Sequence, residues 1–383
     1  MTRVHVRDPA RADVVGSLLR PPALRAAAER FYAPGAAGRS AGERARDRNE
    51  LTRLEDEAVI EAARRQIDAG LDVITDGEMR RYMFQNSFWD ALEGFSTDRN
   101  PVRFRDDQGT TVTWHVQRIE RRLRRTGPNP AAEEAAFLAR HTDRPFKVTF
   151  PAASLFALPF TFKPGINDHA YADLRELVDH CVAIERELVA ETVAAGARAV
   201  QFDFPAYPYL VDPAWREAIE ATGWSVEQVL ELAVRTDTEV LAAVPDNVTV
   251  SLHVCRGNNQ SRYLCEGPLD PVADAMFSLP YDRFLVEWED PQRMGGFEAL
   301  SGLPRGGPIA VLGIVSSKRP ELESVESVCR RIDDAARFCD LDQLAISTQC
   351  GFASTLPGNA ISEGEQWAKL ELVGTAASKV WGE

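Results

Sequence analysis

The feature that most constrains the fold is a repeated pattern, a short run rich in β-branched residues followed by a longer segment with helical spacing. Many of the helical segments are long, such as residues 171–196. Eight alternating units predict an α/β protein, a (β/α)8 TIM barrel, because each parallel strand needs a crossover helix. A doubly wound sheet is the second choice, since no phosphate-binding glycine fingerprint is present. The eight predicted strands are 13–17, 72–77, 147–151, 199–204, 248–254, 283–288, 309–314 and 343–348.

Two segments depart from the repeat. The N-terminal region carries a loop before a long predicted helix at residues 51–70, and residues 80–145 form an excursion after the second predicted strand. We expect one catalytic barrel domain over residues 1–383, because α/β barrels with insertions reach this length. The excursion contains an arginine cluster, for which a solvated helix face is favoured over an anion site. The cluster consists of Arg118, Arg121, Arg122, Arg124 and Arg125.

Charge and cysteine content narrow the class of partner. The chain has 44 basic and 58 acidic residues, a formal net charge of -14, which argues against nucleic acid or an anionic membrane. No apolar run reaches transmembrane length and the first residues lack the apolar core of a signal peptide, so a cytoplasmic protein with a small-molecule ligand is expected. Six cysteines in such a chain are not a disulfide framework.

Residues able to bind a metal gather at the predicted strand ends. His253 and Cys255 end the fifth strand, and because strand side chains alternate they point to the same side. Cys350 follows the eighth strand, and all three would meet at one rim of a barrel. One imidazole and two thiols suit zinc. A His-x-Cys pair alone is weak, since a packed histidine and cysteine are equally common, but the third residue strengthens the prediction.

A carboxylate is the candidate for a fourth ligand. Glu287 and Glu289 share one face of the sixth strand, and Glu287 lies nearer the strand body, so we favour it. Cys265 is a competing thiol in the loop after strand five, where packing is expected. Two thiolates and a carboxylate would neutralise zinc and make it a poor Lewis acid for hydrolysis. Such a site favours activation of an incoming thiol for alkylation.

These motifs give the chain a specific resemblance. ITDGEMRR, LHVCRGNN, FLVEWED, VLGIVSSK and STQCGFAST resemble the cobalamin-independent methionine synthase family, in the short form that corresponds to its C-terminal catalytic barrel. The resemblance runs from about residue 14 to about residue 373. It implies a zinc site at His253, Cys255, Glu287 and Cys350, and an activity like that of 5-methyltetrahydropteroyltriglutamate-homocysteine S-methyltransferase.

The resemblance also implies a site for the amino-acid part of homocysteine. The residues concerned are Gly16, Ser17, Glu78 and Asp203. Two carboxylates directed at one rim would repel each other unless a cation lies between them, and a substrate ammonium would serve. The alternative for Glu78 is an arginine partner, since Arg80 and Arg81 follow it.

Two departures from the family pattern concern the methyl donor. The family's Asp-Glu-Pro-Ala reads Asp203-Phe204-Pro205-Ala206, and Val315 stands where a proton-handling histidine is expected. The N-terminal half that binds polyglutamylated folate in full-length enzymes is absent from this sequence. A folate leaving group needs a proton, so we expect a donor that does not, such as a corrinoid protein. Lys318 is the nearest replacement acid, but as a surface lysine it is expected to be solvated or to contact an anion.

Three functions are compatible with these residues. The leading prediction is a zinc-dependent methyltransferase that makes methionine from homocysteine. The second is an epoxyalkane:coenzyme M transferase, a lyase that opens an epoxide with a zinc-bound thiol; it would not need Glu78 and Asp203 for an ammonium. The third is a zinc-binding barrel without turnover, which predicts zinc without enhanced thiol binding.

Overall fold

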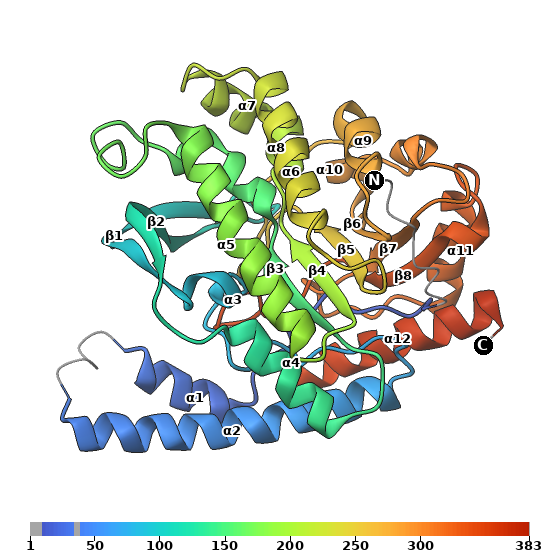
Figure 1. The fold of residues 1–383 in the computed structure, drawn as a ribbon. Helices are drawn as coiled ribbons and strands as arrows, with labels where there is room; N and C mark the ends of the chain where they lie inside the picture. Colours follow the sequence, from blue (N-terminus) through green and yellow to red (C-terminus); the bar gives the residue numbers. More distant parts are fainter. Residues whose placement is uncertain (1–9, 34–38, 383) are drawn as a thin grey trace.

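The computed structural model describes residues 10–33 and 39–382. At its centre lies a six-stranded parallel sheet in the order β3-β4-β5-β6-β7-β8 (Figure 1). Its strands consist almost entirely of buried residues, as expected for parallel strands covered by helices. They are β3 (Lys147–Pro151), β4 (Ala199–Asp203), β5 (Thr249–Val254), β6 (Arg283–Glu287), β7 (Ile309–Val315) and β8 (Leu344–Thr348).

Two short segments join the edges of this sheet. Backbone hydrogen bonds connect Ile346 of β8 to Arg11 and Asp13, each at 2.9 Å, and Asp72 N donates to Ala12 O at 3.0 Å. Ile74 lies in a parallel bridge to Phe146, next to β3. The predicted strands at 13–17 and 72–77 are therefore single bridges rather than strands. At the second segment the backbone turns away at Gly77 and Glu78, where φ is 69° and 54°.

The six strands and these two segments together form a closed ring in the order of a TIM barrel, and the predicted fold class is confirmed. The six remaining predicted strands agree with β3–β8 to within one residue at each end.

The longer helices pack around the sheet, and α4 and α5 lie in front of β3 and β4 in Figure 1. The predicted helix at 51–70 belongs to α2, which starts earlier because Ser40 and Glu43 form a capping box. No helix within the described ranges is long and apolar enough to cross a membrane. The helices of eight or more residues are α1 (Pro22–Phe31), α2 (Ala41–Asp68), α4 (Pro130–His141), α5 (Leu174–Ala194), α7 (Pro213–Glu220), α8 (Val226–Leu241), α9 (Asp270–Phe277), α11 (Val325–Ala335) and α12 (Glu363–Trp381).

Short helices fill the loops. The α-helical turns are α3 (Asn86–Trp89), α6 (Tyr207–Val211) and α10 (Pro291–Met294), and the 3-10 turns are η2 (Ala153–Ala157), η3 (Pro159–Thr161), η4 (Glu298–Gly302) and η5 (Leu341–Gln343). Most of these turns follow the carboxyl ends of strands, where an α/β barrel carries its site.

A buried ion cluster closes the amino ends of the strands. The Asp13 carboxylate accepts from Lys147 Nζ at 2.6 Å and pairs with Arg283 Nη2 at 3.1 Å. Burial acts to raise the pKa of Asp13, but the charges of Lys147 and Arg283 outweigh it and hold the pKa below its usual value. The barrel interior above the cluster is filled by small apolar residues, among them Val15 and Val311.

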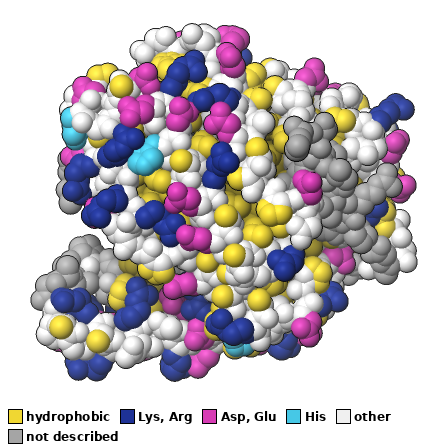
Figure 2. Space-filling view, in the orientation of Figure 1, with side chains coloured by type: hydrophobic (Ala, Val, Ile, Leu, Met, Phe, Trp, Pro, Cys, Tyr) yellow, Lys and Arg dark blue, Asp and Glu magenta, His cyan; other side chains and the backbone are white. Residues whose placement is uncertain are grey.

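The arginine-rich part of the excursion after the second barrel segment is a β-hairpin, not a solvated helix, and α3 and α4 flank it. Strands β1 (Leu92–Arg105) and β2 (Thr111–Arg125) pair antiparallel, at the left of Figure 1. The helical interpretation of the arginine-rich segment was therefore wrong. Arg122, Arg124 and Arg125 form ion pairs with Glu176, Glu93 and Glu191, so these three arginines already have acidic partners. Figure 2 shows basic and acidic side chains interspersed on one face of the molecule.

Candidate active site

The fifth and eighth strands bring together the three predicted zinc ligands. His253 and Cys255 project from the carboxyl end of β5 to the same side, and Cys350 lies two residues beyond β8. Candidate ligand atoms of the three side chains all lie within 4.8 Å of one another, and all three residues are buried. The barrel thus brings Cys350 next to two residues that precede it by 95 and 97 positions in the sequence.

The orientation of His253 fits a metal ligand. Its Nδ1 lies 3.2 Å from the carbonyl oxygen of Leu285 on β6, which favours the tautomer with the proton on Nδ1. Its Nε2 is buried and has no hydrogen-bond partner. A buried nitrogen without a partner is costly in a protein interior, and a zinc ion would satisfy it. The donor set of one imidazole and two thiols therefore fits zinc.

The two thiols differ in their acidity. The hydrogen bond from Cys255 holds the pKa of Cys350 well below its usual value, while burial raises the pKa of Cys255 well above it. The cluster therefore already favours a thiolate at Cys350, which is the form that binds a metal.

Glu287 lies beside this cluster but is bound to other residues. Its Oε1 accepts from Lys318 Nζ at 3.0 Å and Gln349 Nε2 at 2.8 Å, and its Oε2 accepts from the Arg256 backbone N at 2.7 Å. Glu287 is not in the three-residue group. Lys318 is 7% exposed, so the expectation of a surface lysine was wrong, whereas its contact with an anion was anticipated.

The other two competing ligands lie elsewhere. Glu289 pairs with Arg293 at 3.6 Å and with Arg319 at 3.8 Å. Cys265 is fully buried and packs, as expected. Among the residues that the structure describes, neither belongs to the His253 cluster.

The four predicted substrate residues lie close together at the same rim. Ser17, Glu78 and Asp203 line the cavity that also contains the metal-ligand candidates. A Cβ atom on Gly16 would lie 3.0 Å from Glu78 Oε1, so a glycine lets that carboxylate approach. The Ser17 hydroxyl accepts a 3.4 Å hydrogen bond from Ala353 N, which ties the first barrel segment to the loop after β8.

Glu78 is held in place by a buried polar network. Thr149 Oγ1 donates to Glu78 Oε1 at 2.7 Å, and Arg81 Nη1 lies 3.5 Å from the same oxygen. Arg81 Nε and Nη2 donate to the two carboxylate oxygens of Glu134, at 2.8 and 2.5 Å. Glu78 Oε2 remains buried without a partner. Arg81 thus contacts Glu78 as the alternative prediction suggested, but a second acid shares its charge and Glu78 keeps a free oxygen.

Asp203 is also poised to receive a cation. Gln201 Nε2 donates to its Oδ1 at 2.7 Å. Burial raises the pKa of Asp203 to about 7, although the nearby His253 lowers it, and the negative charge of Glu78 adds to the rise. A substrate ammonium between Glu78 and Asp203 would offset the repulsion between these two buried carboxylates.

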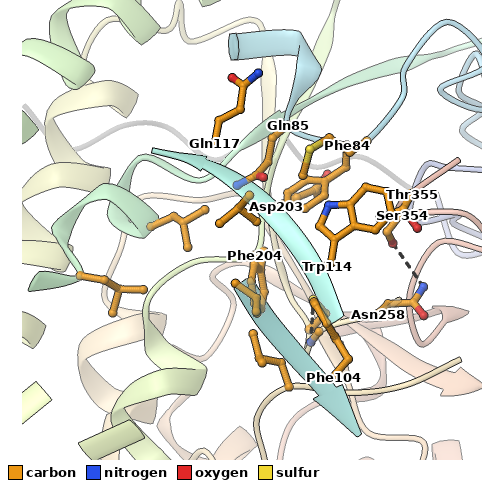
Figure 3. Close-up of a pocket in the computed structure, with 18 of the residues that line it drawn as sticks. Phe84, Gln85, Phe104, Trp114, Gln117, Asp203, Phe204, Asn258, Ser354 and Thr355 are labelled. Carbon is orange, nitrogen blue, oxygen red and sulfur yellow. Dashed lines mark hydrogen bonds between the residues drawn. The ribbon is translucent and has the colours of Figure 1, made fainter. Parts of the chain in front are cut away.

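These residues share one cavity of about 510 Å³, within the range of small-molecule sites. Residues of β1 and β2 form part of its wall, and Figure 3 shows Phe104 and Trp114 on these strands with Phe84, Phe204 and Asp203 around the same space. Sequence analysis missed this wall. The signal was available, because Val112, Trp114 and Val116 alternate with exposed residues in β2, and alternation is typical of a strand.

Comparisons with known proteins show which family this chain resembles. Residues 167–366 match the family model described as "Cobalamin-independent synthase, Catalytic domain". The uncharacterized protein YxjG of Bacillus subtilis is 34% identical over 384 residues, covering 98% of this chain and 96% of that protein. A methionine synthase of Saccharolobus islandicus is 25% identical over 298 residues, covering 77% and 76%.

A solved structure shows the same fold. The B12-independent methionine synthase from Shewanella sp. W3-18-1, in complex with selenomethionine, superimposes with a TM-score of 0.70 at 20% identity and covers 98% of both chains. The family-model match spans more than half of the chain, and the similarity to YxjG extends over nearly all of it. The chain therefore belongs to the cobalamin-independent methionine synthase family.

Proposed function

We propose that this protein is a zinc-dependent methyltransferase that transfers a methyl group to the thiol of homocysteine and so forms methionine. The observation that carries the proposal is that one cavity contains both the His253, Cys255 and Cys350 cluster and the two carboxylates of Glu78 and Asp203. The first group suits a metal and a thiol, and the second suits an ammonium. Homocysteine carries both a thiol and an ammonium.

One group of residues would bind the zinc ion. His253, Cys255 and Cys350 would hold zinc, with Glu287 as the candidate fourth ligand. Zinc held by two thiolates would supply a site that keeps a substrate thiol deprotonated near neutral pH. The carbonyl of Leu285 orients His253 for this role, and Lys318 and Gln349 hold the Glu287 carboxylate next to it.

The rim residues position the substrate. Glu78 Oε2 and Asp203 are available to the ammonium, with Thr149 and Gln201 fixing the two carboxylates. The Ser17 hydroxyl can donate to the substrate carboxylate. In the reaction a bond forms between the homocysteine sulfur and the methyl carbon as the methyl–donor bond breaks. The leaving atom keeps the bonding electron pair, and the thiol proton is released.

The donor is the open part of this proposal. Val315 is fully buried at the end of β7, and Lys318 is committed to Glu287, so neither offers an acid to a folate leaving group. The comparisons give no support to a corrinoid protein, and we do not include one. An epoxyalkane:coenzyme M transferase is less well supported, since Glu78 and Asp203 would face the sulfonate of coenzyme M with like charge.

The test measures zinc and thiol binding separately from turnover. Metal content is measured by mass spectrometry, and zinc-edge X-ray absorption is recorded alone, with homocysteine and with coenzyme M. We expect about one zinc per chain and an added sulfur ligand with homocysteine. Added sulfur from coenzyme M but not from homocysteine would favour the lyase. Zinc without added sulfur from either thiol would favour a barrel without turnover.

A further inference from the structure

Part of the wall of this cavity is formed by large apolar, mostly aromatic side chains. We call this region the aromatic chamber and define it by Phe84, Phe104, Trp114, Val116, Phe160 and Phe204, all of which line the cavity. Phe84 and Phe204 meet edge to face, with ring centroids 6.3 Å apart. Phe104, Trp114 and Val116 come from the β1–β2 hairpin (Figure 3). Such a surface is favourable for apolar, aromatic ligands.

The position of Phe204 is imposed by the backbone. Phe204 follows Asp203 directly and has φ of 59°, a left-handed conformation that is strained for a non-glycine residue. Its backbone N donates to the His253 carbonyl at 3.0 Å, which helps to fix this conformation. The Phe204 ring therefore places apolar surface next to Asp203, the residue proposed to bind the substrate ammonium.

The charges around the cavity do not favour a polyanionic donor. Glu78 and Asp203 supply negative charge at the thiol end. Arg118 and Lys163 are the cations among the described lining residues; Lys163 is exposed and Arg118 is partly exposed. Cations that remain in contact with water contribute little to binding an anion. An anionic tail would therefore gain little here.

Neutral polar groups offer weaker and more specific contacts. Trp114 Nε1, Gln117 Oε1 and Asn258 Oδ1 are buried and have no hydrogen-bond partner, and all three residues line the cavity. An indole N–H without a partner favours a ligand that carries an uncharged acceptor atom. The chamber thus combines a large apolar surface with a few neutral hydrogen-bonding groups.

We propose that the aromatic chamber binds the methyl donor and selects an uncharged aromatic compound that carries its transferable methyl group on a heteroatom. The inference rests on the proposed function, because it assigns the second substrate of that reaction. The bond from the heteroatom to the methyl carbon breaks as the bond from the homocysteine sulfur to that carbon forms; the heteroatom keeps the electron pair and leaves as an anion, and the thiol proton is released to water. The products are methionine, the anion of the demethylated aromatic compound and a proton.

The test is a displacement experiment with the wild-type, zinc-loaded protein. N-phenyl-1-naphthylamine, a neutral aromatic fluorophore, serves as the probe, and its emission rises on transfer to an apolar site. Competitors are thioanisole, the anionic 5-methyltetrahydropteroyltriglutamate and the cationic S-adenosylmethionine. We expect thioanisole to displace the probe at least tenfold more effectively than either charged donor. Equal or better displacement by a charged donor overturns the proposal.

A matched pair of variants locates the probe. Val116→Asp places a charge on the chamber wall, and Thr113→Asp places one on the exposed face of the same strand. We expect Val116→Asp to weaken probe binding at least about tenfold, because an unpaired charge is costly in an apolar site, and Thr113→Asp to leave it unchanged. Equal effects overturn the assignment. Val116→Thr, which keeps the side-chain shape, serves if the aspartate variant does not fold, and we expect it to weaken binding severalfold.

The zinc-edge measurement separates this proposal from the function it rests on. If homocysteine adds no sulfur ligand while thioanisole still displaces the probe selectively, the proposed thiol chemistry fails and the chamber assignment stands. If homocysteine adds sulfur and a charged donor displaces the probe best, the proposed function stands and the donor class is wrong.

Discussion

Replacing Lys318 with methionine tests how Glu287 is used. The substitution removes the 3.0 Å ion pair with Glu287 and keeps a long apolar side chain in a buried position. Loss of one partner from a buried ion pair costs about 3–5 kcal/mol. Gln349 and the Arg256 backbone still donate to Glu287, so we take the lower end, about 3 kcal/mol, for metal-free protein.

The size of this loss translates into a measurable shift in melting temperature. Unfolding entropy near 60 °C is about 2.1 cal/mol/K per residue, which for 383 residues gives about 0.8 kcal/mol/K. A loss of about 3 kcal/mol therefore lowers the melting temperature of the metal-free protein by about 4 °C. If Glu287 serves as the fourth zinc ligand, the ion compensates its charge, and the zinc-loaded protein should lose less than half as much.

The assay is calorimetry of wild type and Lys318→Met, each with bound zinc and after chelation. Glu287→Gln combined with Lys318→Met provides the control, because removing both charges should restore much of the stability lost in the metal-free state. Equal losses with and without zinc would show that Glu287 stays with Lys318 and is not a ligand. No loss in metal-free protein would refute the magnitude assigned to the ion pair.

Three further predictions follow from the site and the core. Cys255→Ser and Cys350→Ser should each lose most of the zinc and keep the wild-type circular dichroism, because a rim site adds little to the core; full zinc occupancy in both would reject the ligand set. Asp203→Asn should weaken homocysteine binding by about 1–3 kcal/mol and leave a simple alkyl thiol unaffected in calorimetric titration, and equal losses would indicate a structural role. Asp13→Asn should lower the free energy of unfolding, measured in urea at pH 7, by about 3–5 kcal/mol. The substitution leaves Lys147 and Arg283 buried without their anion. Because its folded pKa is lowered, Asp13 stabilises the protein fully above its unfolded pKa of about 4 and loses this effect as the pH falls; a difference between wild type and Asp13→Asn that does not shrink in acid would contradict the assignment.

The sequence by itself determined most of the barrel and which residues gather at its rim. Strand periodicity and β-branched runs are local properties, and they placed β3–β8 within one residue. Alternation along β5 put His253 and Cys255 on one side, and the rule that barrel strands end at one rim added Cys350. These predictions needed only the order of the elements and the side-chain alternation within each strand.

Tertiary structure decided how the remaining polar and aromatic residues are used. From the sequence we predict a surface lysine at Lys318. In the structure it contacts Glu287, 31 positions away, because β6 and β7 are neighbours in the sheet. Segments 11–13 and 72–74 hold too few hydrogen bonds to form strands, and only the closing contacts define them.

The structure of the β1–β2 hairpin was also decided by tertiary contacts. Arginine is a good helix former, so residues 111–125 suggested a helix, but pairing with 92–105 made them a strand. Strand formation depends on a partner and on burial of one face more than on local propensity. The sequence thus determined the chemistry at the strand ends. Tertiary structure decided that the hairpin adds Phe104, Trp114 and Val116 to the wall of the cavity, because the packing of a strand pair depends on residues distant in the sequence.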